Sequence, residues 1–188
     1  LVNTSLDQQV ADNQMAIIPL GRMTGEHADR RVIDFNLTDK ERELITTVSQ
    51  AYHAAGKKVV VLLNVPIAIE TASWRDLVDA ILVVGQPGER AGESIADVLT
   101  GKVSPCGRLV DTWALSYGDA PSDSNFPIEY DSRAIPRPDA DPGYELKNID
   151  YTNYEEGIYV GYRYFTSARK PVAYPFGYGL SYAQFHYS

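Results

Sequence analysis

The sequence predicts an α/β protein: a three-layer sandwich with a mainly parallel sheet, followed by an extended tail rich in Tyr and Pro. Continuous apolar runs at 58–63 and 80–84 are typical of strands buried on both faces, as in parallel sheets. Helical patterns alternate with these runs, which favours right-handed crossovers and helices on both faces of the sheet. After residue 115 the alternation ends, and the last 73 residues hold twelve of the thirteen Tyr and seven of the eleven Pro.

The first predicted elements are a short helix and a short strand. Apolar residues recur every four positions from Val2 to Val10, which predicts a helix up to Asn13. The apolar run at 15–20 predicts the first strand. Because Pro19 has no N–H to donate to a neighbouring strand, this strand either lies at a sheet edge or ends there.

A longer helix is predicted between the first two strands. Residues 38–41 form a capping box, and apolar residues from Leu44 to Tyr52 share one helical face that stops before Gly56. After the strand at 58–63, a further helical stretch is expected at 69–78.

The remaining core elements follow the third strand, at 80–84. The segment 85–88, Gly-Gln-Pro-Gly, opens a helix predicted at 89–99. Residues 107–112 are predicted to form a fourth strand.

The tail differs in composition from the rest of the chain, so we predict a boundary between a sandwich core at 1–115 and a tail at 116–188 that packs on it. Residues 117–153 are polar and Pro-rich, which indicates a long extended loop. Aromatic segments at 158–165 and 174–182 are predicted to form short strands or turns.

The composition excludes several classes of function. A net charge of −8 and a pI near 4.8, without clustered Lys and Arg, argue against a nucleic-acid partner. One Cys, Cys106, excludes an internal disulfide, and three scattered His do not match a zinc signature. No apolar run is long enough to span a membrane, and the start of the chain has no signal-peptide pattern. The cellular location stays open.

The candidate site is the polar loop at 21–30, which follows the first predicted strand. In open α/β sheets ligands bind at the carboxyl edge, where this loop would lie. Glu26 follows Gly25, whose flexible backbone allows the carboxylate to be held forward, so we predict that Glu26 donates a proton in catalysis. The alternative is a solvated loop carboxylate paired with Arg22 or Arg30.

Four stretches of the sequence together resemble a known family. They are the loop at 21–30, the turn and helix at 85–109, the Tyr-Glu-Glu-Gly stretch at 154–165 and the aromatic stretch at 174–182. In this order they are similar to the second, α/β sandwich domain of glycoside hydrolase family 3. The chain departs from the family pattern at His27, where Gly is common, and at Cys106, where Ser is usual.

The resemblance implies an enzyme that hydrolyses terminal β-linked sugars by a retaining mechanism, with water as acceptor and without metal or cofactor. Its substrates would be β-linked oligosaccharides or aryl and alkyl β-glycosides, as for β-glucosidases or β-xylosidases. Glu26 would be the acid/base residue, and Arg22, Thr24 and His27 would contact the substrate. The Asp nucleophile would come from a (β/α) barrel domain that this chain does not contain, so the chain alone is expected to be inactive.

Two other functions remain open at this point. The Gly-rich turn at 85–88 before a helix could bind the phosphates of a nucleotide or flavin, although it lacks the complete phosphate-loop pattern. The chain could also be a non-catalytic carbohydrate-binding domain, in which the tail tyrosines stack on sugar rings.

Overall fold

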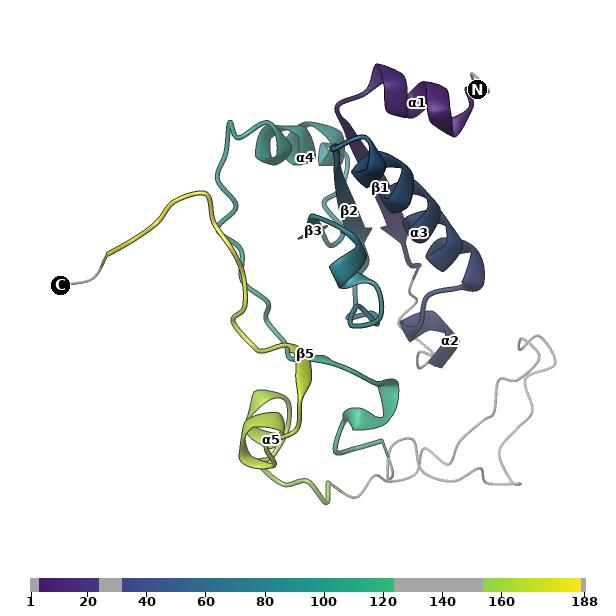
Figure 1. Cartoon of the computed structure of the whole chain (residues 1–188). Coiled ribbons are helices and arrows are strands. Elements are labelled where there is room, and N and C mark those ends of the chain that lie inside the picture. The colour runs from purple at the N-terminus through teal and green to yellow at the C-terminus, as the bar shows by residue number, and fades with distance from the viewer. Residues whose placement is uncertain (1–3, 24–31, 124–153, 187–188) are drawn as a thin grey trace.

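The computed structural model describes residues 4–23, 32–123 and 154–186 (Figure 1). Its centre is a parallel sheet of three strands in the order β1-β2-β3. The strands are β1 (Met15–Gly21), β2 (Lys58–Asn64) and β3 (Ala80–Val83). The three strands confirm the parallel sheet that the apolar runs predict, and β1 lies at its edge, where Pro19 removes no hydrogen bond from a neighbouring strand.

Helices flank this sheet, as the predicted sandwich requires. The longest is α3 (Asp39–Ala54), and α1 (Leu6–Asp12) packs against it. In the view of Figure 1, α3 lies to the right of β2 and α4 (Ala91–Leu99) to its left. The Nζ of Lys57 donates to the carbonyl of Asn13 at 2.7 Å, and this contact ties the end of α1 to the start of β2.

The main core lies between α3 and the face of the sheet that it covers. Alternate residues of β1 are buried, and they pair in register with the fully buried residues of β2. From α3, Ile45 and Tyr52 close this core. The core residues of these three elements are Ala16, Ile18, Leu20, Ile45, Tyr52, Val59, Val61 and Leu63.

The connection from β2 to β3 is largely non-helical, contrary to the helix expected at 69–78. It holds one short 3-10 helix, η1 (Arg75–Leu77). Ile69 and Trp74 are completely buried, and the Trp74 Nε1 donates to the carbonyl of Glu70 at 2.7 Å. The buried side chains anchor this connection to the core, and between them the backbone does not form a regular helix.

The fourth strand predicted at 107–112 does not form. Instead β4 (Trp113–Ala114) pairs antiparallel with β5 (Val172–Tyr174), in a second sheet. Trp113 is 3% exposed and belongs to the main core, so it fixes this strand. This pairing joins segments on the two sides of the boundary predicted at residue 115.

The aromatic segment at 158–165 is also different from the prediction, because it ends in a helix. α5 (Tyr162–Ser167) begins after Gly161. The φ angle of Gly161 is 53°, a positive value that glycine adopts without strain. Phe165 is buried on this helix. Two short elements were not predicted: α2 (Val32–Phe35) and the 3-10 helix η2 (Tyr117–Asp119).

Candidate active site

The loop predicted to carry the proton donor begins at the carboxyl edge of the parallel sheet. Gly21, the last residue of β1, pairs with Asn64, the last residue of β2. The N–H of Arg22 donates to the carbonyl of Asn64 at 3.2 Å. The segments that follow β1 and β2 therefore both start at the carboxyl edge of the sheet. Ligands bind at this edge in open α/β sheets.

Three of the four predicted site residues lie in the segment 24–31, outside the described residues. They are Thr24, Glu26 and His27, and their roles stay predictions. The described chain resumes directly after this segment with α2. The structure therefore places the two ends of the segment, both near the start of α3.

Arg22 is the fourth predicted site residue, and its side chain bonds to acceptors of the protein itself. The side chain is 13% exposed. Nε donates to the carbonyl of Asp34 (3.1 Å), Nη1 to the carbonyl of Gly21 (2.9 Å) and Oε1 of Glu41 (2.6 Å), and Nη2 to the carbonyl of Asn36 (3.1 Å) and Oε2 of Glu41 (3.0 Å). A guanidinium has five N–H donors, so each donor of Arg22 has an internal acceptor.

Glu41 has two roles in this arrangement. As predicted, it completes the capping box of α3: its Oε2 accepts from the backbone N–H of Thr38 at 2.8 Å, while the Thr38 hydroxyl accepts from the N–H of Glu41. Burial raises the pKa of Glu41, but hydrogen bonds from Arg22 and Thr38 outweigh it and hold this pKa below its usual value. Glu41 is therefore a charged anchor for Arg22 and is unsuited to donate a proton.

The role of Glu41 at the site was missed from the sequence. The capping box indicates that Glu41 begins a helix, but no pattern links it to Arg22, nineteen positions away. Among the described residues, the carboxylate that pairs with Arg22 is Glu41. The pairing of Glu26 lies outside these residues, so the alternative of a solvated Glu26 stays open.

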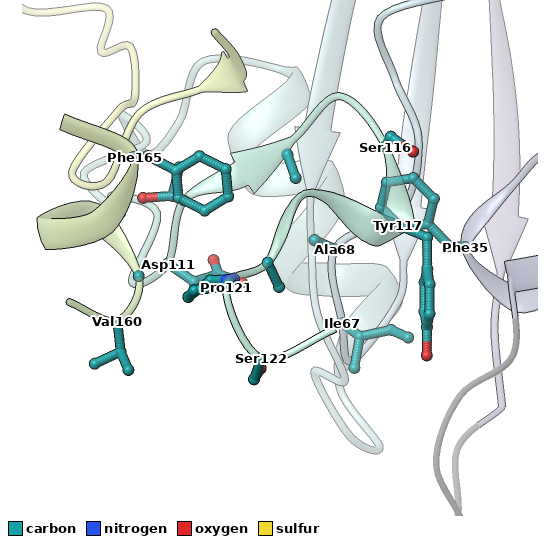
Figure 2. Close-up of a pocket in the computed structure, with 14 residues that line it drawn as sticks. Phe35, Ile67, Ala68, Asp111, Ser116, Tyr117, Pro121, Ser122, Val160 and Phe165 are labelled. Atoms are coloured by element: carbon teal, nitrogen blue, oxygen red, sulfur yellow. The ribbon is translucent and has the colours of Figure 1, made fainter. Parts of the chain in front are cut away.

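A mostly apolar cavity of about 370 Å³ opens between α2, the segment after β2 and the tail (Figure 2). Phe35 of α2 and Tyr117 lie edge to face, with ring centroids 6.0 Å apart. Figure 2 shows Phe165 at the other side of the cavity. Thr112 lines this cavity, and its hydroxyl oxygen is buried without a hydrogen-bond partner among the described residues. The cavity lies beyond the carboxyl end of β2 and next to the helix that follows the segment 24–31.

The Gly-rich segment at 85–88 lies in the connection between β3, which ends at Val83, and α4, which begins at Ala91. Gly85 and Gly88 have φ angles of 60° and 74°, and α4 begins three residues after the second of them. Both angles lie in the region that glycine adopts without strain. The turn thus has a structural explanation that requires no phosphate.

Two further features concern metals and membranes. Across residues 4–23, 32–123 and 154–186, no three His, Cys, Asp or Glu side chains are grouped to hold a metal ion. Within the same residues, no helix has the length and apolar character to cross a membrane. Cys106 is an exposed free thiol.

Comparison with known proteins identifies the class. A family profile described as "Glycosyl hydrolase family 3 C-terminal domain" matches residues 3–162. The chain is 38% identical over 192 residues to a beta-glucosidase of Ruminococcus albus, and 35% identical over 160 residues to an exo-alpha-(1->6)-L-arabinopyranosidase of Bifidobacterium breve. The first match covers the whole chain and 18% of the relative, the second 85% of the chain and 18% of the relative.

A solved structure agrees with these matches. Beta-glucosidase 3B from Thermotoga neapolitana, determined in complex with glucose, superposes with a TM-score of 0.80 at 44% identity, over 95% of this chain and 23% of that protein. The chain belongs to glycosyl hydrolase family 3 and corresponds to the C-terminal α/β domain of its β-glucosidases. It spans about a fifth of the length of these relatives.

Proposed function

We propose that this chain supplies the acid/base residue, Glu26, to a retaining glycosidase that acts on terminal β-linked sugars. The observation that carries the proposal is the position of Gly21 and Arg22 at the carboxyl edge of the sheet, in a chain of this family. The segment that contains Glu26 leaves the sheet at this edge, where a partner domain can cover it.

The chemistry requires two carboxyl groups about 5 to 5.5 Å apart. An Asp of the barrel domain attacks the anomeric carbon, while Glu26 protonates the glycosidic oxygen as the bond to the leaving group breaks. In the second step, the Glu26 carboxylate takes a proton from water as the water displaces the Asp. Glu26 needs a raised pKa for the first step, and desolvation by the barrel and the charge of the Asp both raise it.

The choice of sugar is proposed to depend on the barrel domain and not on this chain. Two relatives that are each 35% or more identical to this chain have names that state different sugars: one is a beta-glucosidase and the other an arabinopyranosidase. We propose a β-glucosidase-like specificity, with Thr24 and His27 close to the substrate. The barrel is the partner that completes the site, and the chain without it hydrolyses no β-glycoside.

The test is the variant Glu26→Gln in the complete enzyme, with its barrel domain. Loss of the general acid lowers kcat/KM for alkyl β-glucosides by about 10² to 10⁴-fold, and by much less for dinitrophenyl β-glucosides, whose leaving group requires no protonation. The matched control is Glu93→Gln, because Glu93 is an exposed carboxylate on α4, away from the proposed site, that pairs with Arg90. Unchanged turnover in Glu26→Gln would contradict the proposal and support a non-catalytic carbohydrate-binding role.

A further inference from the structure

Arg22 joins the two sides of the segment that contains Glu26. Before this segment it bonds to the carbonyl of Gly21, and after it to the carbonyls of Asp34 and Asn36. One rigid planar group thus holds the end of β1 and the exit of α2 in a fixed relation.

The same group is tied to the first turn of α3. Both oxygens of Glu41 accept from Arg22, at 2.6 Å and 3.0 Å, in a two-point pair. The Glu41 side chain is 22% exposed and is held in turn by the capping box with Thr38. Arg22 is therefore anchored to α3, the longest helix in the described part of the chain.

The donor count argues against direct contact between Arg22 and the sugar. All five N–H groups have internal acceptors, and a sugar hydroxyl would have to displace one of them. Displacement from Glu41 would leave a partly buried carboxylate without its counter-charge, which is costly.

We propose that Arg22 is a positioning residue: through the Gly21, Asp34 and Asn36 carbonyls and the Glu41 carboxylate, it sets the placement of Glu26 for proton donation. This inference rests on the proposed function of Glu26. It assigns to Arg22 a role in place of the substrate contact that the family resemblance implies.

The inference predicts a specific kinetic pattern. kcat/KM reports the step in which the glycosidic bond breaks, and a misplaced acid slows this step most for leaving groups that require a proton. A residue that binds the sugar instead affects good and poor leaving groups equally, because the sugar is the same.

The experiment is Arg22→Met in the complete enzyme, assayed with alkyl and dinitrophenyl β-glucosides. We expect kcat/KM to fall about 10 to 100-fold for the alkyl glucosides, as displacement of a reacting group by about 1 Å does, and less than about 3-fold for the dinitrophenyl glucosides. Arg90→Met is the matched control, because Arg90 pairs with Glu93 on α4 and both are exposed. It is expected to leave both values unchanged.

A milder variant, Glu41→Gln, keeps the inference testable if Arg22→Met unfolds. Glutamine can take the place of glutamate in a capping box, so α3 keeps its N-terminal cap while Arg22 loses the charge of its partner. We expect the same leaving-group pattern with a smaller loss. The double variant is expected to be no worse than Arg22→Met, because both changes act on one pair.

Two outcomes would overturn the inference: equal losses for both classes of leaving group, which indicate sugar binding or general instability, and no loss for either class. Glu26→Gln separates this failure from failure of the proposed function. If Glu26→Gln loses activity only with poor leaving groups and Arg22→Met does not, the inference is wrong and the proposed function stands. If Glu26→Gln has no effect, the proposed function itself is wrong.

Discussion

A hydrogen-bonded carboxylate lies at each end of the parallel sheet, Asp79 at the amino end of the strands and Glu41 at the carboxyl end. The groups that donate to the two carboxylates differ in how exposed they are. At the amino end, Oδ1 of Asp79 accepts from Lys58 Nζ (2.7 Å), while Oδ2 accepts from the backbone N–H of Val59 (2.8 Å) and lies 2.9 Å from His53 Nε2. The Lys58 and His53 side chains are 72% and 43% exposed. This cluster joins the starts of β2 and β3 to the end of α3.

At the carboxyl end, Glu41 accepts from a well-buried arginine and from the cap of α3. These hydrogen bonds, together with that from Arg22 to the carbonyl of Asn36, join the end of β1 to the start of α3 and to the chain after α2. The comparison teaches that similar ion-pair chemistry serves two purposes. At one end it assembles strands, and at the other it fixes the ends of a segment that carries the proposed proton donor.

The largest loss of stability is expected from a change in α3, because this helix contributes to the clusters at both ends of the sheet. Ile45 is completely buried on α3, the helix that reaches from Glu41 to His53. Ile45→Ala is expected to lower the free energy of unfolding by about 2 to 5 kcal/mol, because it leaves a cavity in the core. Urea unfolding followed by circular dichroism measures this loss.

The neighbouring residue provides the control for that prediction. Leu44 is 46% exposed on the same helix, so Leu44→Ala removes little buried surface. An equal loss of stability in both variants would show that the side of α3 facing the sheet is not the side that stabilises the domain.

A smaller effect is expected from the amino end alone. Asp79→Ala leaves the N–H of Val59 without an acceptor and is expected to lower the free energy of unfolding by about 1 to 3 kcal/mol. Asp76→Ala is the control, because the Asp76 side chain is 91% exposed. In the complete enzyme, Asp79→Ala is expected to leave the leaving-group dependence of kcat/KM unchanged. A change like that of Arg22→Met would contradict the division of roles between the two ends.

The smallest effect concerns pH. Hydrogen bonds from Lys58, Val59 and His53 hold the pKa of Asp79 well below its ordinary value of 3.8. A group with a lowered pKa stabilises the folded state above its ordinary pKa, and this contribution is lost as the pH falls towards the folded-state value. The urea midpoint should therefore fall as the pH is lowered below about 4.

The variant Asp79→Asn removes this titrating group and should make the urea midpoint less dependent on pH in the same range. Glu41, whose pKa is also lowered, contributes with the same sign, so part of the dependence is expected to remain. An unchanged slope in Asp79→Asn would show that Asp79 does not couple folding to pH.

Short-range patterns predicted the sheet and its main helix well. The run at 58–63 became β2, and the capping box at 38–41 marked the start of α3, because both signals depend on neighbouring residues. The predicted strand at 107–112 failed for the opposite reason. Trp113 and Ala114 find their partners in β5, and no local pattern shows such a distant pairing.

The candidate site divides in the same way. The position of the loop at 21–30 after an apolar run was sufficient to predict that it leaves the carboxyl edge of the sheet, and its first residues, Gly21 and Arg22, lie there. The partners of Arg22 could not be predicted, since two of them are the backbone carbonyls of Asp34 and Asn36, whose positions depend on how the chain folds after the loop.

The sequence by itself determined the class of fold and the family, because these depend on periodicity and on short motifs; that Glu26 is the proton donor stays a prediction. The tertiary structure decided that the donors of Arg22 are taken up by Glu41 and by nearby carbonyls. A hydrogen-bond network of this kind depends on distances and angles between segments, and those exist only once α2 and α3 have packed beside the end of β1.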